Sequence, residues 1–280
     1  MKYIYIILLL AVLGASLFFG IREFTASNNR NTNINPNTNI NQGFNQNTNQ
    51  AVNAGPENNN INIPTEVINA NIAVESVQGV RPEITRGNTE KKQVIFTFDA
   101  GSGIQSAQKI LDTLKNHNLT ATFFLTGKWI EKNPDLVEKM SVAGHEIFNH
   151  TYDHPHLTQI SDAEIADELK KMDDLMLYYT NQTTKPYFRP PYGDRNAHVV
   201  EIAGNQGYTS VFWTVDALDW EESTGMTAAK VKDRIISKLA PGNIYLMHVG
   251  DNITGEILEE MIQKIQNQGY KIVSLTEGLK

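Results

Sequence analysis

The segment Val94-Ile95-Phe96-Thr97-Phe98-Asp99-Ala100-Gly101 decides the fold of this 280-residue chain. Its β-branched and aromatic residues predict a buried strand that ends at Asp99. The residues that follow, 103–117, repeat apolar side chains at helical spacing, which predicts an amphipathic helix packed against that strand. A buried strand followed by such a helix is typical of folds with a parallel sheet.

The same alternation continues to the end of the chain. Further strands are predicted at residues 121–125, 146–148, 186–188, 209–215, 244–247 and 270–273. Helices are predicted at residues 129–143, 161–180, 198–206, 228–239 and 253–267, and Ser161 with Glu164 is typical of a capping box. No glycine-rich dinucleotide turn follows the first strand, which disfavours a nucleotide-binding sheet. The alternation predicts an α/β fold, either a (β/α) barrel or an open doubly wound sheet, and the residues at the strand ends described next favour a barrel, incomplete and with seven parallel strands.

Ionisable residues follow five of the predicted strands. They are Asp99, His150, Arg189, Asp216 and His248. The carboxyl ends of barrel strands form the rim on which active sites are built, so we expect these five side chains to share one site.

The motif His150-Thr151-Tyr152-Asp153-His154-Pro155 supplies two histidines four residues apart. This spacing can bring two imidazoles to one divalent ion, which would activate water and polarise a carbonyl. Asp99 could accept a proton from that water, and a separate histidine could protonate a leaving group. No G-x-S-x-G elbow is present, so the residues favour metal-assisted hydrolysis of an amide or ester over a serine mechanism.

The composition excludes several other classes. The chain has no cysteine, which rules out disulfides, thiolate zinc sites and a cysteine nucleophile. A formal net charge of −7 with 24 Lys and Arg residues argues against a nucleic-acid partner.

The first 90 residues are predicted to precede the catalytic domain. Residues 1–26 contain a run of about 19 apolar residues, which is long enough to cross a bilayer. We interpret this run as an uncleaved signal-anchor, and a cleaved signal peptide is the alternative. Residues 27–63 are rich in asparagine and predict a disordered linker, and 64–90 form a leading segment before the catalytic domain at 91–280. We expect a membrane-held, extracytoplasmic domain, or a secreted one if the apolar segment is cleaved.

Five ordered motifs from about residue 88 onward resemble those of the polysaccharide deacetylases, carbohydrate esterase family 4. They are Thr97-Phe98-Asp99-Ala100, His150-x-x-x-His154-Pro155, Arg189-Pro190-Pro191-Tyr192, Asp216-x-x-Asp219-Trp220 and Leu246-Met247-His248. The resemblance implies a distorted barrel that uses a divalent metal to remove acetyl groups from N-acetylated sugars. We expect the metal to be zinc, with other transition metals as alternatives.

The resemblance also assigns roles to residues. Asp99 matches the catalytic base, His150 and His154 the metal ligands, and His248 the general acid. Arg189 would orient Asp99, and Asp216 would pair with His248 and raise its pKa. The Tyr192 N–H would stabilise the oxyanion, while Trp220, Leu246 and Pro191 would contact substrate. We interpret Asp219 as a structural hydrogen-bond acceptor and Trp213 as a core residue.

Ala100 departs from the family pattern, in which a second aspartate at this position is the third metal ligand. Three explanations are open: water or another carboxylate completes the metal shell, Asp99 moves onto the metal, or the site is weak. The leading hypothesis is an N-deacetylase of peptidoglycan or a chitin-like glycan. An O-acetyl esterase and a glycan-binding module without catalysis are the alternatives.

Overall fold

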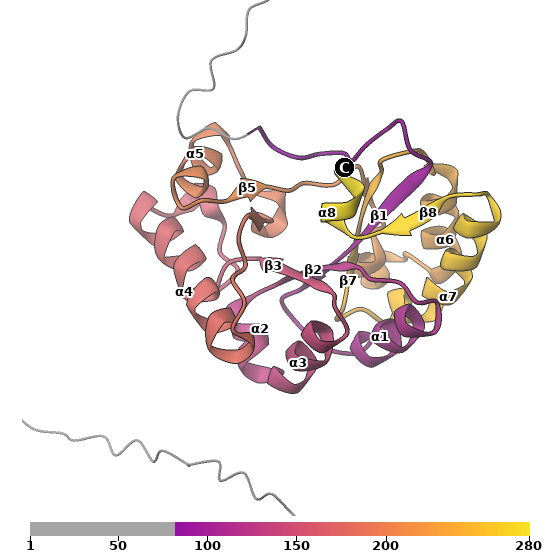
Figure 1. Ribbon diagram of the computed structural model, residues 1–280, viewed down its shortest axis with the longest axis horizontal. Coiled ribbons are helices and arrows are strands. Elements are labelled where there is room, and N and C mark those ends of the chain that lie inside the picture. The colour runs from indigo at the N-terminus through magenta and orange to yellow at the C-terminus, as the bar shows by residue number, and fades with distance from the viewer. Residues whose placement is uncertain (1–81) are drawn as a thin grey trace, which may run out of the picture. The chain divides into compact units, whose positions relative to one another are not determined.

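The computed structural model describes residues 82–280 (Figure 1). Its strands are β1 (Gln93–Ala100), β2 (Thr122–Leu125), β3 (Glu146–Asn149), β4 (Tyr187–Phe188), β5 (Thr209–Ser210), β6 (Val215–Asp216), β7 (Ile244–His248) and β8 (Lys271–Val273). Its α-helices are α1 (Ala107–Asn116), α2 (Gly127–Lys132), α3 (Pro134–Val142), α4 (Asp162–Thr180), α5 (Ala197–Asn205), α6 (Ala228–Ser237), α7 (Asn252–Asn267) and α8 (Leu275–Gly278). Three short 3₁₀ helices complete the elements: η1 (Leu157–Gln159), η2 (Pro191–Gly193) and η3 (Asp219–Thr224).

All the strand pairs are parallel, as the alternation of strands and helices predicts. Seven strands follow the order β5-β4-β3-β2-β1-β7-β6, and β8 pairs with the first residues of β1. The strands curl into a half-barrel, with β5 and β6 at opposite ends of this order and not paired to each other in the described region. The predicted seven-stranded parallel sheet is confirmed, but the barrel is open.

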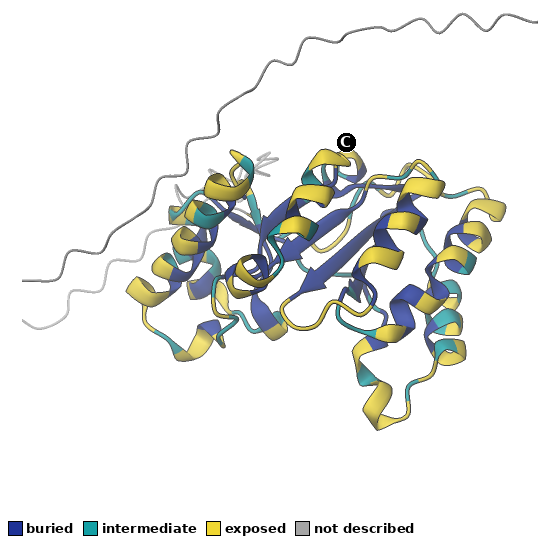
Figure 2. Ribbon diagram, turned by 90° about the horizontal axis from the view of Figure 1, so that it is seen from below, coloured by how far each residue is buried: buried dark blue, intermediate teal, exposed yellow. Residues whose placement is uncertain are grey.

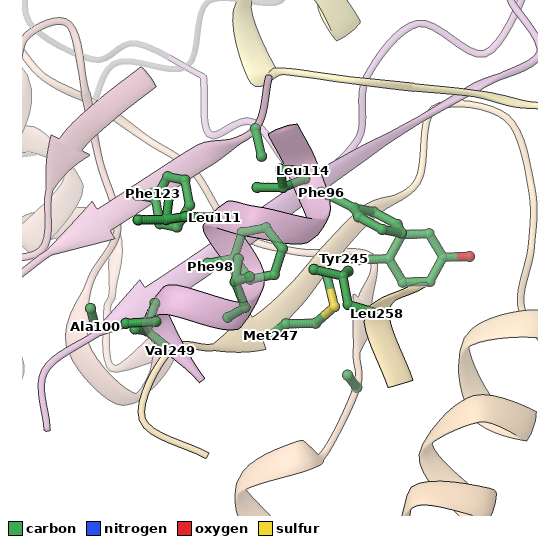
Figure 3. Packing of buried hydrophobic residues seen from close by; sticks show 14 of the residues in the cluster. Phe96, Phe98, Ala100, Leu111, Leu114, Phe123, Tyr245, Met247, Val249 and Leu258 are labelled. Carbon is green, nitrogen blue, oxygen red and sulfur yellow. The ribbon is translucent and has the colours of Figure 1, made fainter. Parts of the chain in front are cut away.

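The alternation of side chains along β1 separates the core from the site. Phe96, Phe98 and Ala100 point into the largest apolar cluster, between the sheet and the outer helices (Figure 3). Thr97 and Asp99 therefore point to the opposite, concave face of the sheet. Most strand residues are buried, and the helices expose their outer faces to solvent (Figure 2).

Two predicted elements are each divided in the structure. The run 209–215 is not one strand, because Val211 bridges to Ile84 in the leading segment and the chain rejoins the sheet only at β6. The predicted helix at 129–143 is two helices, α2 and α3, because Pro134 has no N–H to continue the first.

The predicted membrane segment, the asparagine-rich linker and residues 64–81 of the leading segment lie outside the described residues. The rest of the leading segment packs on the domain: the Gly87 N–H donates to the Gly242 carbonyl at 2.7 Å. Within residues 82–280, none of the helices combines the length and apolar character that a bilayer crossing requires.

Candidate active site

Most of the predicted rim residues lie around one cavity of about 600 Å³ at the carboxyl ends of the strands. The parallel register explains the convergence, since Asp99 at the end of β1 is opposite His248 at the end of β7. His150 follows β3, and Asp216 ends β6. These four side chains line the cavity, and Arg189, after β4, reaches it through its contact with Asp99.

Asp99 and Arg189 form a buried ion pair. Nη1 of Arg189 donates to Oδ1 of Asp99 at 2.6 Å, and the Arg189 side chain is fully buried. The guanidinium also donates to the carbonyls of Val211 and Phe212 and to Oγ1 of Thr97. This arrangement fixes the Asp99 carboxylate and leaves its second oxygen, Oδ2, 3.5 Å from Nε2 of His150.

His150 and His154 face each other across the cavity floor, with their Nε2 atoms 3.2 Å apart. Burial lowers the pKa of His150, and burial together with the charge of His150 lowers the pKa of His154 to about 3. Both imidazoles are therefore neutral at physiological pH. Nδ1 of His150 donates to the Arg189 carbonyl at 2.8 Å, so its Nε2 carries the free lone pair.

The loop that carries these histidines is held from three sides. Asn149 accepts a hydrogen bond from the Thr151 N–H at 2.8 Å, where the backbone turns left-handed with φ of 66°. Glu168 of α4, which is buried, accepts from the N–H groups of Tyr152 and Asp153 at 2.9 and 2.7 Å. The first N–H groups of α2 donate to carbonyls of the same loop. Sequence reasoning missed Glu168, because its place on α4 carries no local signal.

We expect Glu168→Ala to weaken divalent-metal binding by about tenfold, because partners that orient metal ligands contribute on that scale. The substitution leaves two backbone donors without an acceptor and frees the His150–His154 loop. Calorimetric titration of the full chain with Zn²⁺ measures the change, and Glu138→Ala on the exposed surface of α3 is the matched control. Equal affinities of the Glu168 and Glu138 variants would contradict the orienting role.

His248 pairs with Asp219, which corrects the prediction that Asp216 is its partner. Nδ1 of His248 donates to Oδ1 of Asp219 at 2.9 Å, and the His248 backbone N–H donates to Oδ2 at 2.7 Å. Burial opposes the charged imidazole, but the hydrogen bond and charge of Asp219 outweigh it and raise the pKa of His248 to about 9. Asp216 instead accepts from the Leu218 N–H at 2.8 Å.

Asp219 is fully buried because the chain turns back at Leu218, which has φ of 60°. Its Oδ2 also accepts a hydrogen bond from Thr254 of α7. Asp219 is thus a hydrogen-bond acceptor, as predicted, but its donors include the imidazole of His248, so its role is not only structural.

Aromatic and apolar residues form the mouth of the cavity. Tyr192 and Trp220 line it and are 62% and 49% exposed, and the buried Leu246 also lines it. His156 stacks on Tyr192 with ring centroids 4.2 Å apart. One prediction needs correction, because Pro190 lines the cavity whereas Pro191 is buried in η2. Trp213 packs against an apolar cluster, as predicted, and also lines the cavity.

The described residues also contain a possible metal-binding group outside the histidine pair. Asp219, His248 and Asp251 present ligand atoms within 4.8 Å of one another. Both oxygens of Asp219 already accept hydrogen bonds, which makes them poorer ligands. The histidine pair fits a metal better, since two nitrogens on a tetrahedral zinc ion are about 3.3 Å apart by the usual bond lengths.

The site combines a half-barrel of parallel strands with two carboxylates, each paired with a cationic side chain, and a pair of histidines at its rim. This combination is typical of a hydrolase. The comparisons with known proteins agree with this class. Residues 86–211 match the polysaccharide deacetylase family. The peptidoglycan-N-acetylmuramic acid deacetylase PdaA of Bacillus subtilis is 35% identical over 191 residues, which cover 68% of this chain and 73% of that protein.

Two further relatives are similar. The peptidoglycan-N-acetylglucosamine deacetylase of Bacillus cereus is 33% identical, covering 68% of this chain and 69% of that protein. A solved pseudoenzyme of the same carbohydrate esterase family from Bacillus anthracis superposes with a TM-score of 0.67 at 36% identity, covering 71% of this chain and 69% of that one. The chain belongs to the polysaccharide deacetylases, carbohydrate esterase family 4.

Proposed function

We propose that this protein removes N-acetyl groups from amino sugars of an extracellular glycan, with peptidoglycan as the substrate. The observation that carries the proposal is the presence of two ion pairs around the cavity that also holds the histidine pair. In one, Arg189 holds the Asp99 carboxylate, and in the other, Asp219 holds the His248 imidazole. One group is suited to accept a proton and the other to donate one, which is the division of work that amide hydrolysis requires.

His150 and His154 would hold the metal, and zinc is the metal we expect. A bound divalent ion supplies Lewis-acid polarisation of a carbonyl oxygen and lowers the pKa of water. Asp99, held by Arg189, takes the proton from the attacking water. The exposed Tyr192 lies at the cavity mouth, where its backbone N–H can donate to the developing oxyanion.

His248 protonates the amine that leaves. Its pKa of about 9 keeps the imidazole charged at neutral pH, as a general acid requires. Trp220 and Leu246 contact the substrate at the cavity wall. The apolar N-terminal segment, by this proposal, holds the catalytic domain outside the cytoplasm and close to the cell wall.

The test is acetate release by the full chain from N-acetylglucosamine oligomers and from peptidoglycan strands. We expect a chelator to abolish release and Zn²⁺ to restore it. Acetylxylan in a parallel sample distinguishes an O-acetyl esterase. Release that is unaffected by the chelator would contradict the role of the histidine pair.

Ala100→Asp tests whether a third protein ligand is missing. A carboxylate is costly to keep in the apolar cluster into which Ala100 points, so we expect the end of β1 to turn it toward the histidine pair and the variant to bind Zn²⁺ about tenfold more tightly. It should also unfold at lower temperature, because Ala100 is 1% exposed beside Phe98 and Val249 in the apolar cluster (Figure 3). Zinc titration with thermal unfolding measures both effects, and Ala100→Asn controls for size. Equal zinc affinity in the Asp and Asn variants would show that position 100 does not reach the metal.

Glycan binding without catalysis is the second candidate function. It is favoured by Ala100 and by the similarity to the Bacillus anthracis pseudoenzyme. Binding of N-acetylglucosamine oligomers with no acetate release from any substrate, with Zn²⁺ present, would support it over the first.

A further inference from the structure

Asp251 places a carboxylate in the cavity that no role described above uses. It is the N-cap residue of α7, but its side chain makes no capping hydrogen bond. Its backbone carbonyl accepts a hydrogen bond from Ser106, which fixes this position in the chain. One carboxylate oxygen lies within 4.8 Å of both a His248 ring nitrogen and an Asp219 oxygen, and the side chain lines the cavity.

The cavity is acidic once its ion pairs are counted. Asp99 is compensated by Arg189, and Asp219 by the charged His248. Asp216 and Asp251 form no ion pair with a lysine or arginine, and the cavity lining within residues 82–280 includes neither residue type, so the charged His248 is the one lining cation that Asp219, Asp251 and Asp216 share. Burial raises the pKa of both carboxyls, and for Asp251 the charge of Asp219 adds to it, as is usual where negative charges are poorly compensated.

Peptidoglycan offers two amino sugars that differ in charge. N-acetylmuramic acid carries a lactyl ether on the ring carbon next to the one that bears the acetamide, and N-acetylglucosamine has a hydroxyl there. A free lactyl carboxylate therefore enters the cavity with the reacting amide, within a few ångströms of it. Its repulsion by a nearby carboxylate is on the order of 1 kcal/mol or more at the effective dielectric of a partly buried site, which corresponds to about tenfold.

We propose that Asp251, with Asp216, makes the site select reacting sugars that carry no acidic substituent, and so N-acetylglucosamine over N-acetylmuramic acid with a free lactyl group. This inference rests on the proposed deacetylase function and specifies the substrate of that same site. The chain thus differs in preference from its relative PdaA, whose substrate is named as N-acetylmuramic acid.

The experiment compares three oligosaccharides with the full chain and Zn²⁺. They are tetra-N-acetylchitotetraose, a tetrasaccharide of alternating N-acetylglucosamine and N-acetylmuramic acid with free lactyl groups, and the same tetrasaccharide as its lactyl methyl esters. Mass spectrometry identifies which sugar loses acetyl, and calorimetry measures binding to the metal-free protein. The ester has the size of the acid without its charge, so steric exclusion and repulsion are separated.

We expect the muramic acid residue of the methyl ester to lose its acetyl group about tenfold faster than that of the free acid. The ester should also bind more tightly than the acid. Asp251→Asn should lower both ratios toward one, and Asp251→Asn combined with Asp216→Asn should bring them close to one; asparagine is an equally good N-cap residue, so the fold is kept. Asp233→Asn on the exposed side of α6 is the control and should keep both ratios.

Equal rates and affinities for acid and ester, or ratios that Asp251→Asn leaves unchanged, would overturn the inference. No acetate from any of the three would instead remove the proposed function. In that case the calorimetric ratio of ester to acid still decides whether the cavity repels the carboxylate.

Discussion

Asp99→Asn is expected to lower acetate release by about 10²–10⁴-fold, the usual contribution of a positioned general base. The amide keeps the shape of the carboxylate and can still accept a hydrogen bond from Arg189, but it cannot take up a proton from water. Substrate binding should change much less, so the loss appears in kcat and little in KM. Steady-state kinetics with N-acetylglucosamine oligomers measures it.

The same substitution also leaves the buried Arg189 guanidinium without its counter-charge. Removing one partner of a buried ion pair typically costs about 3–5 kcal/mol in the free energy of unfolding, measurable with guanidinium chloride. Thr97→Val is the matched control, because Thr97 accepts from the same guanidinium at 2.9 Å and is fully buried. It should lower stability by about 1–3 kcal/mol and retain most activity. An Asp99→Asn variant within tenfold of the native rate would exclude Asp99 as the base.

Asp219→Asn is expected to move the alkaline limit of activity from about pH 9 to 6.5 or below. Asp219 raises the pKa of His248 against the opposing effect of burial, so without its charge the imidazole loses its proton near or below the ordinary value of 6.5. At pH 8 the charged fraction should fall by at least about thirtyfold, and the rate with it. At pH 5.5 the loss should be much smaller.

A pH–rate profile of kcat/KM measures this shift, with Asp216→Asn as the comparison because Asp216 makes no hydrogen bond to His248 in the structure. Stability follows the same group. Since the folded-state pKa is raised, the His248 pair stabilises the native protein fully below pH 6.5, and this is lost as pH rises through about 9. Unfolding curves of Asp219→Asn should lack that dependence. An unchanged alkaline limb in this variant would rule out His248 as the acid that Asp219 tunes.

The order of strands and helices could be predicted from the sequence because each element carries its own periodic pattern. The position of Asp99 and His248 at strand ends follows from that order alone, whereas the pairing of β7 with β1, which brings the two residues together, does not. The division of residues 209–215 could not be predicted, since it depends on Ile84, more than a hundred residues away. An apolar run identifies a strand but not the partner with which each residue pairs.

The partner of His248 illustrates a second limit. Asp216 and Asp219 lie three residues apart, and residue type gives no reason to prefer one over the other. The left-handed backbone at Leu218 decides, because it turns the buried Asp219 toward the ring. A leucine is not a residue from which one would infer such a turn. The role of Glu168 was hidden for a related reason, as it arises from helix packing.

The four hydrogen bonds that hold the Arg189 guanidinium bear on how this family can lose activity in evolution. Its guanidinium joins β1 to the residues after β5, across the concave face of an open sheet. Selection for folding alone would therefore retain Arg189 and Asp99 after catalysis had ceased. An intact Asp99–Arg189 pair identifies a sound scaffold, whereas drift in an inactive lineage should first reach cavity-facing residues that support little else, such as His154 and Trp220.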